Sequence, residues 1–227
     1  MRFLTGKRCR RVQSFGGLKF YRRENKPPQA GSAERCTQCA HERKCPWSAV
    51  KIYVRDRIAK GDKGWPTRGL TYDLTVEGVM KVLREAQIGR CAFECDNNVV
   101  DHQVVNLQYD DGVTGAFTMS SFCEGGRRTI VHGSRGILRG DMDAGVIRWM
   151  DFLTDTWHVI DLNKSSGDIN DGHGGGDALL MKDWLAAIRT GDQSRVLTGP
   201  DESLETHLTT FAAEKSRLSG KVEPVRY

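Results

Sequence analysis

The chain has 227 residues, 28% of them charged and 38% hydrophobic, which are ordinary proportions for a water-soluble globular protein. No stretch approaches the roughly 18 consecutive apolar residues of a membrane-spanning helix, so no such helix is predicted. Met1-Arg2-Phe3-Leu4 is not followed by the apolar segment of a signal peptide, and we therefore expect a cytoplasmic protein. The seven cysteines are an odd number, which favours free thiols or metal ligands over a disulfide framework.

Charge is unevenly distributed along the chain. Residues 1–60 hold 16 Lys and Arg against 4 Asp and Glu, a net charge of +12, and the remainder has a net charge of −7. A basic segment of this kind can bind phosphates, including those of nucleic acids. Its basic residues are scattered among Phe, Gly and Pro rather than aligned on one helix face, so we favour the alternative that they pack against acidic groups.

The first residues have the pattern of an element that is ending. Phe3 to Lys7 resembles a last helical turn, with Gly6 at the position that takes a positive φ. Because such a helix would begin before Met1, we expect the chain to be the rear part of a longer protein. Arg11 to Phe20 is then predicted to be a strand, with a bulge or break at Gly16-Gly17.

Residues 22–70 are predicted to form a loop insertion that carries a cysteine motif. Cys36, Cys39 and Cys45 have the spacing C-x2-C-x5-C, and thiolates two residues apart can bind one tetrahedral metal ion. The candidates for a fourth ligand are His41, Cys9, Cys91 and Cys95. The pattern indicates a structural zinc ion or an iron–sulfur cluster. The alternative is a set of reduced, partly buried thiols in a compact loop.

Two helices are predicted in and after this insertion. Pro46 suits the first turn of a helix that ends at about Arg57. Thr75 is a favourable N-cap for a second helix, which Gly89 would end. The apolar stripe of the second helix consists of Val76, Val79, Met80 and Leu83.

Residues 99–141 are predicted to form consecutive antiparallel strands, and the rest of the chain is expected to pack around them. Side chains alternate between the two faces of a strand, so Asp101, Val105 and Leu107 share one face and His102 lies on the other. This half-polar pattern is typical of a sheet with one covered face. Tight turns are expected at residues 110–112 and 134–136, and two further strands over residues 146–153 and 157–162.

Three residues are candidates for substrate binding. His173 lies among glycines that would let a ligand approach closely, although the same pattern fits a turn that merely exposes the histidine. Asp177 is predicted to cap a helix and, as the less favoured alternative, to contact a ligand. His102 could face a pocket from the open side of the sheet; a histidine hydrogen-bonded within that face is the alternative.

Two closing helices are predicted over residues 178–190 and 201–219. The inward stripe of the first consists of Leu180, Trp184 and Ile188. The inward residues of the second are Leu204, Leu208, Phe211 and Leu218. With the strands, these helices predict an α+β fold: an open-faced, mainly antiparallel sheet with helices packed on one face, in one domain over residues 1–227.

Common catalytic and nucleotide-binding motifs are missing from the sequence. It contains neither G-x-S-x-G nor H-E-x-x-H, and its glycine-rich stretches lack the strand–loop–helix context of a phosphate-binding loop. The predicted helices do not alternate with the strands, so a dinucleotide-binding fold is not expected within this chain.

Several stretches together resemble the C-terminal domain of the Gfo/Idh/MocA family of NAD(P)-dependent oxidoreductases. They are FLTGKRCRRVQSFG at the start, CDNNVVDHQVVNLQYDDGVTGAFTM and IVHGSRGILRGD in the strands, and GHGGGDALLMKDWLAAIRTGD and ESLETHLTTFAAEKSRLSGKV in the closing helices. The segment RCTQCAHERKCPWSA is similar to a cysteine-bearing insertion of one branch.

The resemblance implies the substrate-binding and oligomerisation portion of a sugar or cyclitol oxidoreductase. NAD(P) would carry the hydride in the parental enzyme. The family's dinucleotide-binding half, its E-K-P lysine and its catalytic His and Asp have no counterpart here, so the chain is expected neither to bind NAD(P) nor to turn over by itself. The resemblance also implies a sugar-like ligand near His173 and a homo-oligomer formed through the open sheet face.

Other interpretations stay open. The chain could be a non-catalytic scaffold that pairs with a full-length relative through the sheet. It could be a metal-stabilised nucleic-acid-binding protein, whose binding would weaken steeply with salt; we rank this lower. It could also be a gene fragment.

Overall fold

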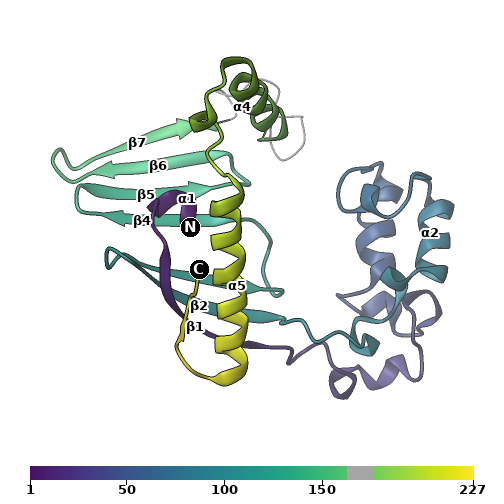
Figure 1. Ribbon diagram of the computed structural model, residues 1–227. Helices are drawn as coiled ribbons and strands as arrows, with labels where there is room; N and C mark the ends of the chain where they lie inside the picture. The colour runs from purple at the N-terminus through teal and green to yellow at the C-terminus, as the bar shows by residue number, and fades with distance from the viewer. Residues whose placement is uncertain (163–175) are drawn as a thin grey trace.

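Two four-stranded antiparallel sheets form the body of the computed structural model, which describes residues 1–162 and 176–227 (Figure 1). The strand order is β3-β2-β1-β8 in the first sheet and β4-β5-β6-β7 in the second. The strands are β1 (Cys9–Gly17), β2 (His102–Tyr109), β3 (Thr114–Ser120), β4 (Arg128–Gly133), β5 (Gly136–Asp141), β6 (Val146–Asp151), β7 (Thr156–Asp161) and β8 (Glu223–Pro224). With the helices described below, they confirm the predicted α+β class.

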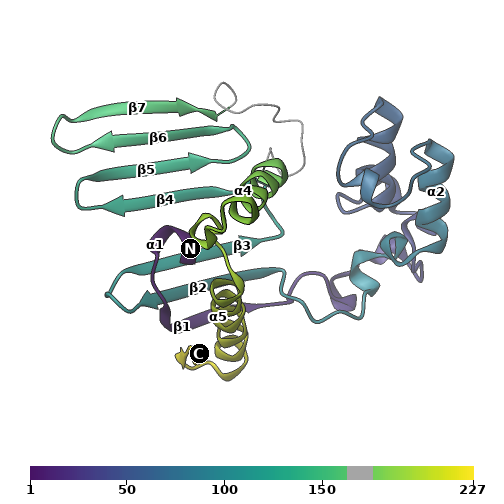
Figure 2. The same cartoon turned by 45° about the horizontal axis from the view of Figure 1, so that its top comes forward.

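The predicted run of consecutive strands is divided between these two sheets. β3 ends the first sheet and β4 begins the second, and no hydrogen-bonded pairing joins them in the described residues. Gly125 and Gly126, between the two strands, both have positive φ angles, 94° and 84°, which turn the chain out of an extended path. Figures 1 and 2 show β4 alongside β3, so the two sheets lie edge to edge in one layer.

The predicted alternation along β2 is confirmed in the first sheet. Val105, Leu107 and Tyr109 are buried on one face, whereas Val104 is exposed on the other. Val12 of β1 joins the buried set, and burying each such side chain contributes roughly 1.5–3 kcal/mol. The bulge predicted at Gly16-Gly17 is wrong: the pairing register shifts between Cys9 and Arg11 instead, and the two glycines pair regularly with β2.

Helix α5 (Pro200–Ser219) covers the buried face of the first sheet, and the short α1 (Arg2–Thr5) lies beside the same sheet (Figure 1). The predicted inward stripe of α5 is largely wrong. Leu204, Phe211 and Leu218 are 57%, 65% and 71% exposed, and only Leu208 packs against the core. The buried residues of α5 are Glu205, Ala213 and Ser216. Small side chains let the helix approach β1 closely, and Ser216 Oγ accepts a hydrogen bond from Ser14 N at 2.9 Å.

Helix α4 (Gly176–Thr190) also differs from the predicted packing. Its expected inward residues Leu180, Trp184 and Ile188 are all exposed, and Ala187 is its only buried residue. The stripe therefore has the helical period but lacks a covering partner within the described residues. A helix with an apolar stripe and no core beneath it presents that stripe to solvent or to another chain.

A separate lobe is inserted between β1 and β2, at the right of Figure 1. Its main helix is α2 (Val76–Glu85), and the predicted N-cap is confirmed, since Thr75 Oγ1 accepts from Gly78 N. Val79 and Leu83 are fully buried there. The helix predicted from Pro46 is shorter than expected and is a π-helix, η5 (Val50–Arg55).

The lobe is otherwise built from single 3₁₀ turns, and one further turn follows α4. They are η1 (Arg23–Asn25), η2 (Pro28–Ala30), η3 (Cys36–Gln38), η4 (Glu42–Lys44), η6 (Ile58–Lys60), η7 (Thr67–Gly69), η8 (Gln87–Gly89), η9 (Ala92–Glu94) and η11 (Gln193–Arg195). α2 ends at Glu85, and Gly89, expected to end it, lies in the next turn.

The second sheet leaves apolar side chains exposed on both of its faces. Ile130, Val159 and Trp157 lie on one face, and Val131, Leu138 and Ile160 lie on the other. The first sheet, with α5 on one face, has the predicted open-faced form, whereas the second sheet is exposed on both faces. Within the described parts of the chain, no helix is both long enough and apolar enough to cross a membrane.

Candidate functional site

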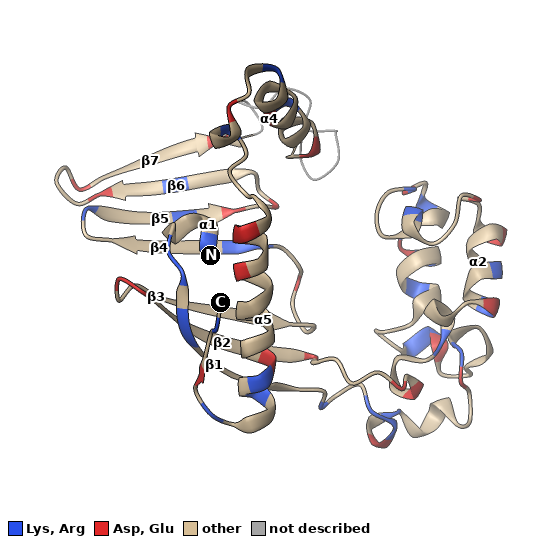
Figure 3. Ribbon diagram, viewed as in Figure 1, with Lys and Arg blue, Asp and Glu red and all other residues tan. Residues whose placement is uncertain are grey.

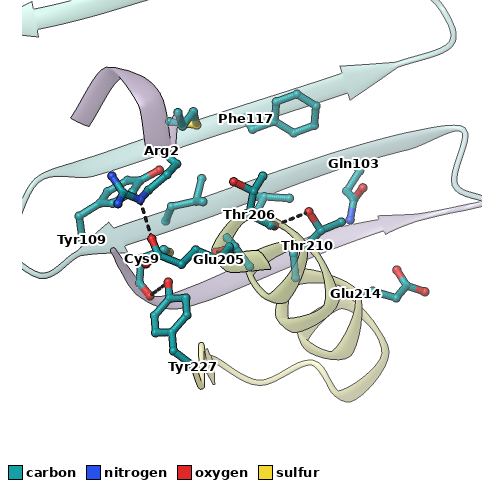
Figure 4. Close-up of a pocket in the computed structure, with 15 residues that line it drawn as sticks. Arg2, Cys9, Gln103, Tyr109, Phe117, Glu205, Thr206, Thr210, Glu214 and Tyr227 are labelled. Carbon is teal, nitrogen blue, oxygen red and sulfur yellow. Dashed lines mark hydrogen bonds and ion pairs between the residues drawn. The ribbon is translucent and has the colours of Figure 1, made fainter. Parts of the chain in front are cut away.

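A cavity of about 420 Å³ lies between α5 and the first sheet, with α1 at one side (Figure 4). Its floor consists of Val105, Leu107 and Tyr109 of β2 and Phe117 of β3. Val105 and Phe117 face each other directly across the two strands. Leu107 pairs with Gly115, which has no side chain, and the methyl group of Met1 fills that space. Strand pairing therefore builds an apolar floor below a helix.

A buried carboxylate stands at the edge of this cavity. Glu205 of α5 accepts a hydrogen bond from Nε of Arg2 at 2.6 Å (Figure 4) and another from Nε of Arg8, also at 2.6 Å. Burial by itself raises the pKa of Glu205, but the two guanidinium groups outweigh it and the net shift is downward. Glu205 is thus held as an anion that joins α1, the start of β1 and α5.

The opposite edge of the cavity carries hydroxyl and amide groups. Thr206 and Thr210 of α5 donate their hydroxyl protons to the carbonyls of Glu202 and Thr206, at 2.9 and 3.0 Å. Their oxygen lone pairs remain able to accept from a ligand. Gln103 Nε2 donates to Ser14 Oγ at 3.0 Å, which orients its amide beside the floor. A ligand with an apolar face and several hydroxyls suits this combination.

The titratable groups on the floor do not supply acid–base chemistry near neutral pH. Burial raises the pKa of Tyr109 to about 12 and also raises the pKa of the Cys9 thiol. Tyr227 Oη donates to the carbonyl of Cys9 at 2.8 Å, and the Arg8 guanidinium lies 5.2 Å from the centre of the Tyr227 ring. These groups hold the C-terminus against β1.

The three predicted substrate-binding residues are not brought together at this cavity. His173 lies outside the described residues. Asp177 is exposed in the first turn of α4, one residue inside its start at Gly176 rather than ahead of the helix as an N-cap. His102 is the first residue of β2 and does not line the cavity. A role for these residues in binding stays a prediction.

His102 forms a pair with a buried carboxylate at the end of the first sheet. Its Nδ1 lies 2.6 Å from Asp101 Oδ1, and the His102 side chain is 48% exposed. The other carboxylate oxygen accepts from the backbone N–H groups of Lys19 and Phe20, at 2.9 and 2.6 Å. Burial opposes ionisation of Asp101, but these donors outweigh it and lower its pKa to about 2. Asp101 thereby ties β2 to the segment that leaves β1.

The predicted metal ligands Cys36, Cys39 and Cys45 all lie in the lobe, around a cavity of about 20 Å³. Burial raises the pKa of the Cys36 and Cys45 thiols, and neighbouring thiols raise both further. All seven cysteines are free thiols. Among the residues that the structure describes, no three His, Cys, Asp or Glu side chains are arranged as a ready metal-binding group. The expected zinc ion therefore has no preformed site.

Basic and acidic positions are interspersed along the inserted lobe (Figure 3), and many basic residues of the first 60 form ion pairs with carboxylates of the same chain. Arg23 and Lys26 both contact Glu94, at 2.7 and 2.8 Å, and Arg55 contacts Glu42 at 2.8 Å. With Arg2 and Arg8 on Glu205, these pairs agree with the favoured interpretation of the basic segment as one that packs against acidic groups.

The residues that shape the cavity were not found from the sequence. Glu205 could not be singled out, because α5 also contains Asp201, Glu202 and Glu214. Arg2 and Arg8 gave no signal, because their partner is about 200 positions away in the chain. Gln103 shares the face of Val105, and a polar residue in a buried row marks the same place.

Comparisons with known proteins bear on the fold. No family model and no curated protein matches the chain. An oxidoreductase domain protein from Kribbella flavida is similar in structure, with a TM-score of 0.53 and 17% identity over 100% of this chain and 48% of that protein. A presumed oxidoreductase from Thermotoga maritima has a TM-score of 0.49 and 12% identity over 99% of this chain and 43% of its own.

At these identities the likeness shows a shared fold and nothing more, and only the first TM-score exceeds 0.5. The chain spans about half the length of the Kribbella flavida protein. The sheets, helices and inserted lobe therefore have the fold of one part of an oxidoreductase domain protein.

Proposed function

We propose that this chain is the substrate-binding and oligomerisation portion of a sugar or cyclitol oxidoreductase of the Gfo/Idh/MocA type, and that it does not turn over by itself. The observation that carries the proposal is the cavity beneath α5, with its apolar floor and its edge of hydroxyl and amide groups. The fold shared with part of an oxidoreductase domain protein supports it.

The size and chemistry of the cavity suit a monosaccharide or cyclitol. Small-molecule sites commonly have volumes of about 300–1,000 Å³, lined by apolar groups and a few placed polar ones. The C–H face of a sugar ring would lie on Leu107 and Phe117, and its hydroxyls would meet Thr206, Thr210 and Gln103. Glu205 would act on the ligand only indirectly, by fixing α5 over the sheet.

NAD(P) would serve the parental enzyme, but the residues of this chain do not fit it. The sequence carries no G-x-G-x-x-G turn, and the cavity has no glycine-rich helix N-terminus among its lining residues to receive a pyrophosphate. No hydride step is therefore assigned to this chain.

Saturation-transfer NMR with myo-inositol and glucose tests the binding role. We expect transfer to at least one of them, and Thr210→Val should weaken its binding about tenfold by removing one hydroxyl contact. Thr118→Val is the matched control, because Thr118 lies on the exposed opposite face of the same sheet. Transfer to neither ligand, or equal binding by both variants, would contradict the proposal.

An absorbance assay for NAD(P)H tests the proposal that the chain does not turn over by itself. Purified chain with NAD⁺ or NADP⁺ and the same polyols should produce no NAD(P)H. Turnover by a preparation shown by mass spectrometry to be free of longer relatives would overturn it.

The second candidate function is a scaffold that pairs with another copy or with a longer relative. The exposed apolar residues of the second sheet and of α4 favour it, because patches of this extent usually mark interaction sites. It predicts association without polyol binding, which distinguishes it from the first candidate.

A further inference from the structure

We infer that the lobe between β1 and β2 binds one zinc ion through four cysteine thiolates, Cys36, Cys39, Cys45 and Cys91. The spacing of the first three cysteines left the fourth ligand open between a histidine and three other cysteines. Two of these candidates, Cys91 and His41, line the same small cavity as the three motif cysteines. Of the two, the backbone bridge beside Cys36 favours Cys91.

A backbone bridge places Cys91 beside the motif. Arg35 and Arg90 form an isolated antiparallel bridge, so the residues that follow them, Cys36 and Cys91, lie on adjoining segments. The N–H of Cys91 donates to the carbonyl of Glu34 at 2.7 Å. Arg35 Nη1 also donates to the carbonyl of Ala86 at 2.7 Å, which fixes this bridge to the end of α2.

The segment between Cys36 and Cys45 folds back on itself through two 3₁₀ turns. Cys39 and Cys45 each directly follow one of these turns, at positions with extended backbone. The N–H of Cys39 donates to the carbonyl of Cys36, and the N–H of Cys45 donates to the carbonyl of Glu42. Repeated turns of this kind return the chain to one place, so three thiols separated by up to nine positions surround a common space.

One of the sulfur atoms already receives a backbone donor. Ala49 N–H points at Cys36 Sγ with an N–S distance of 3.4 Å. Hydrogen bonds of this type stabilise the negative charge of a metal-bound thiolate and orient it. The remaining cysteines are excluded by position: Cys9 lies in the core of the first sheet, Cys123 is exposed, and Cys95 donates to the carbonyl of Cys91 at 3.4 Å.

The four sulfur atoms stand around the cavity without forming a ready metal-binding group. A cysteine side chain has one rotatable bond, so its sulfur can change direction without movement of the backbone. Ligands that close around the ion as it binds are usual where metal binding is coupled to folding. The inference is thus that zinc draws together four thiols that the backbone has already gathered.

The donor set and the size of the space select the ion. Four thiolates in a closed tetrahedral site are the common structural zinc arrangement. A cavity of about 20 Å³ accepts roughly one water-sized sphere, which suits a single ion better than an iron–sulfur cube. The ion would join the motif, the bridge after α2 and η5 in a lobe with few long elements, where such a cross-link stabilises most.

The test uses the full chain, expressed with zinc and passed over a desalting column. Elemental analysis should find close to one zinc ion per chain. Alkylation followed by mass spectrometry should show that zinc protects Cys36, Cys39, Cys45 and Cys91 and leaves Cys95 and Cys123 reactive. Cobalt substitution should give the thiolate charge-transfer and d–d bands of a tetrahedral site. These readouts need no mutation, so they stand even if a variant misfolds.

Two variants then decide the fourth ligand. Cys91→Ser should lose stoichiometric zinc, whereas Cys95→Ser, four positions along in the same segment, should keep it. Loss of zinc on His41→Ala with retention in Cys91→Ser would overturn the assignment of Cys91. A chain that binds no zinc, that shows no thiolate–cobalt bands, or that binds iron and sulfide instead would overturn the inference as a whole.

Discussion

Asp101 is a buried anion at one end of the first sheet, where it joins the start of β2 to the segment that follows β1. Its carboxylate receives His102 Nδ1 and two backbone N–H groups, from Lys19 and Phe20. An anion with three donors and no access to water is stabilised only in the folded chain, so its contribution to folding depends on pH.

The free energy of unfolding should depend on pH through the ionisation of Asp101. The pKa of Asp101 is about 2 when folded and about 3.9 in an unfolded chain, so the folded state is favoured by the charged form. That stabilisation is fully present above about pH 4 and is lost as the pH falls towards about 2. Urea unfolding midpoints measured across this range should fall steeply.

Asp101→Asn is the variant that checks the cause. It should be less stable than the parent at neutral pH and approach it in acid, because it has no charge to lose. Asp183→Asn, an exposed position in α4, should keep the parental pH profile. An unchanged acid limb in Asp101→Asn would exclude Asp101 as its origin.

Glu205 gives a second prediction at the residue scale. Glu205→Gln removes the charge that both Arg2 and Arg8 contact, and should lower the free energy of unfolding by about 2 kcal/mol. Glu214→Gln on the same helix breaks only an exposed pair with Arg217, and should change the free energy of unfolding by less than about 0.5 kcal/mol. Denaturant unfolding monitored by fluorescence measures both. Equal losses would mean that Glu205 is no more important than a surface residue.

Elements are positioned by how closely their backbones approach. Gly16 of β1 lies so near β2 that an added Cβ would stand 2.4 Å from the carbonyl oxygen of His102 and 2.9 Å from Gln103 Cα. The next residue, Gly17, has open space around the same position. Packing against β2 therefore requires glycine at position 16 but not at position 17.

This difference predicts opposite outcomes for neighbouring alanine substitutions. Gly16→Ala should cost more than about 2 kcal/mol of unfolding free energy, because the clash is with backbone and one strand must shift. Gly17→Ala should be neutral or slightly stabilising, since alanine restricts the unfolded chain. Thermal unfolding of the two variants side by side is sufficient, and similar melting temperatures would refute the steric explanation.

The start of α2 followed from local chemistry, but the inward face of α5 did not. Thr75 predicted the start of α2 because an N-cap hydroxyl acts on a donor three residues away. The large apolar residues of α5 were expected inward, yet Ala213 and Ser216 are buried and Phe211 is exposed. A helix that closes directly onto β1 has room only for small side chains, and that distance is a property of two elements rather than one.

The whole molecule carries more apolar surface than its own elements cover. Both faces of the second sheet and most of α4 are exposed, although both contain the pattern of a buried element. The predicted stripe of α4 is exposed instead of packed inward, and no element among the described residues covers it. A second copy of the chain is the simplest partner for an open antiparallel sheet.

Sedimentation analysis tests whether the chain associates with a second copy of itself. The parent should sediment as a dimer or larger, and Val159→Asp should dissociate it by placing a charge in an exposed apolar row. Thr156→Asp is the control, because Thr156 lies on the same strand and points to the opposite face. A parent that is monomeric at all concentrations would contradict the expected oligomer.

The sequence by itself determined the class of the fold, most of the strands and their turns, the face of β2 that is buried and the N-cap of α2. These depend on residues within a few positions of one another. Only the tertiary structure decided that the strands form two sheets, that α5 turns small residues inward, that Glu205 meets Arg2 and Arg8, and that Cys91 lines the same small cavity as the cysteine motif. Each of these depends on contacts between segments far apart in the chain, where the distance between two backbones, and not the pattern of either segment, sets which side chains fit.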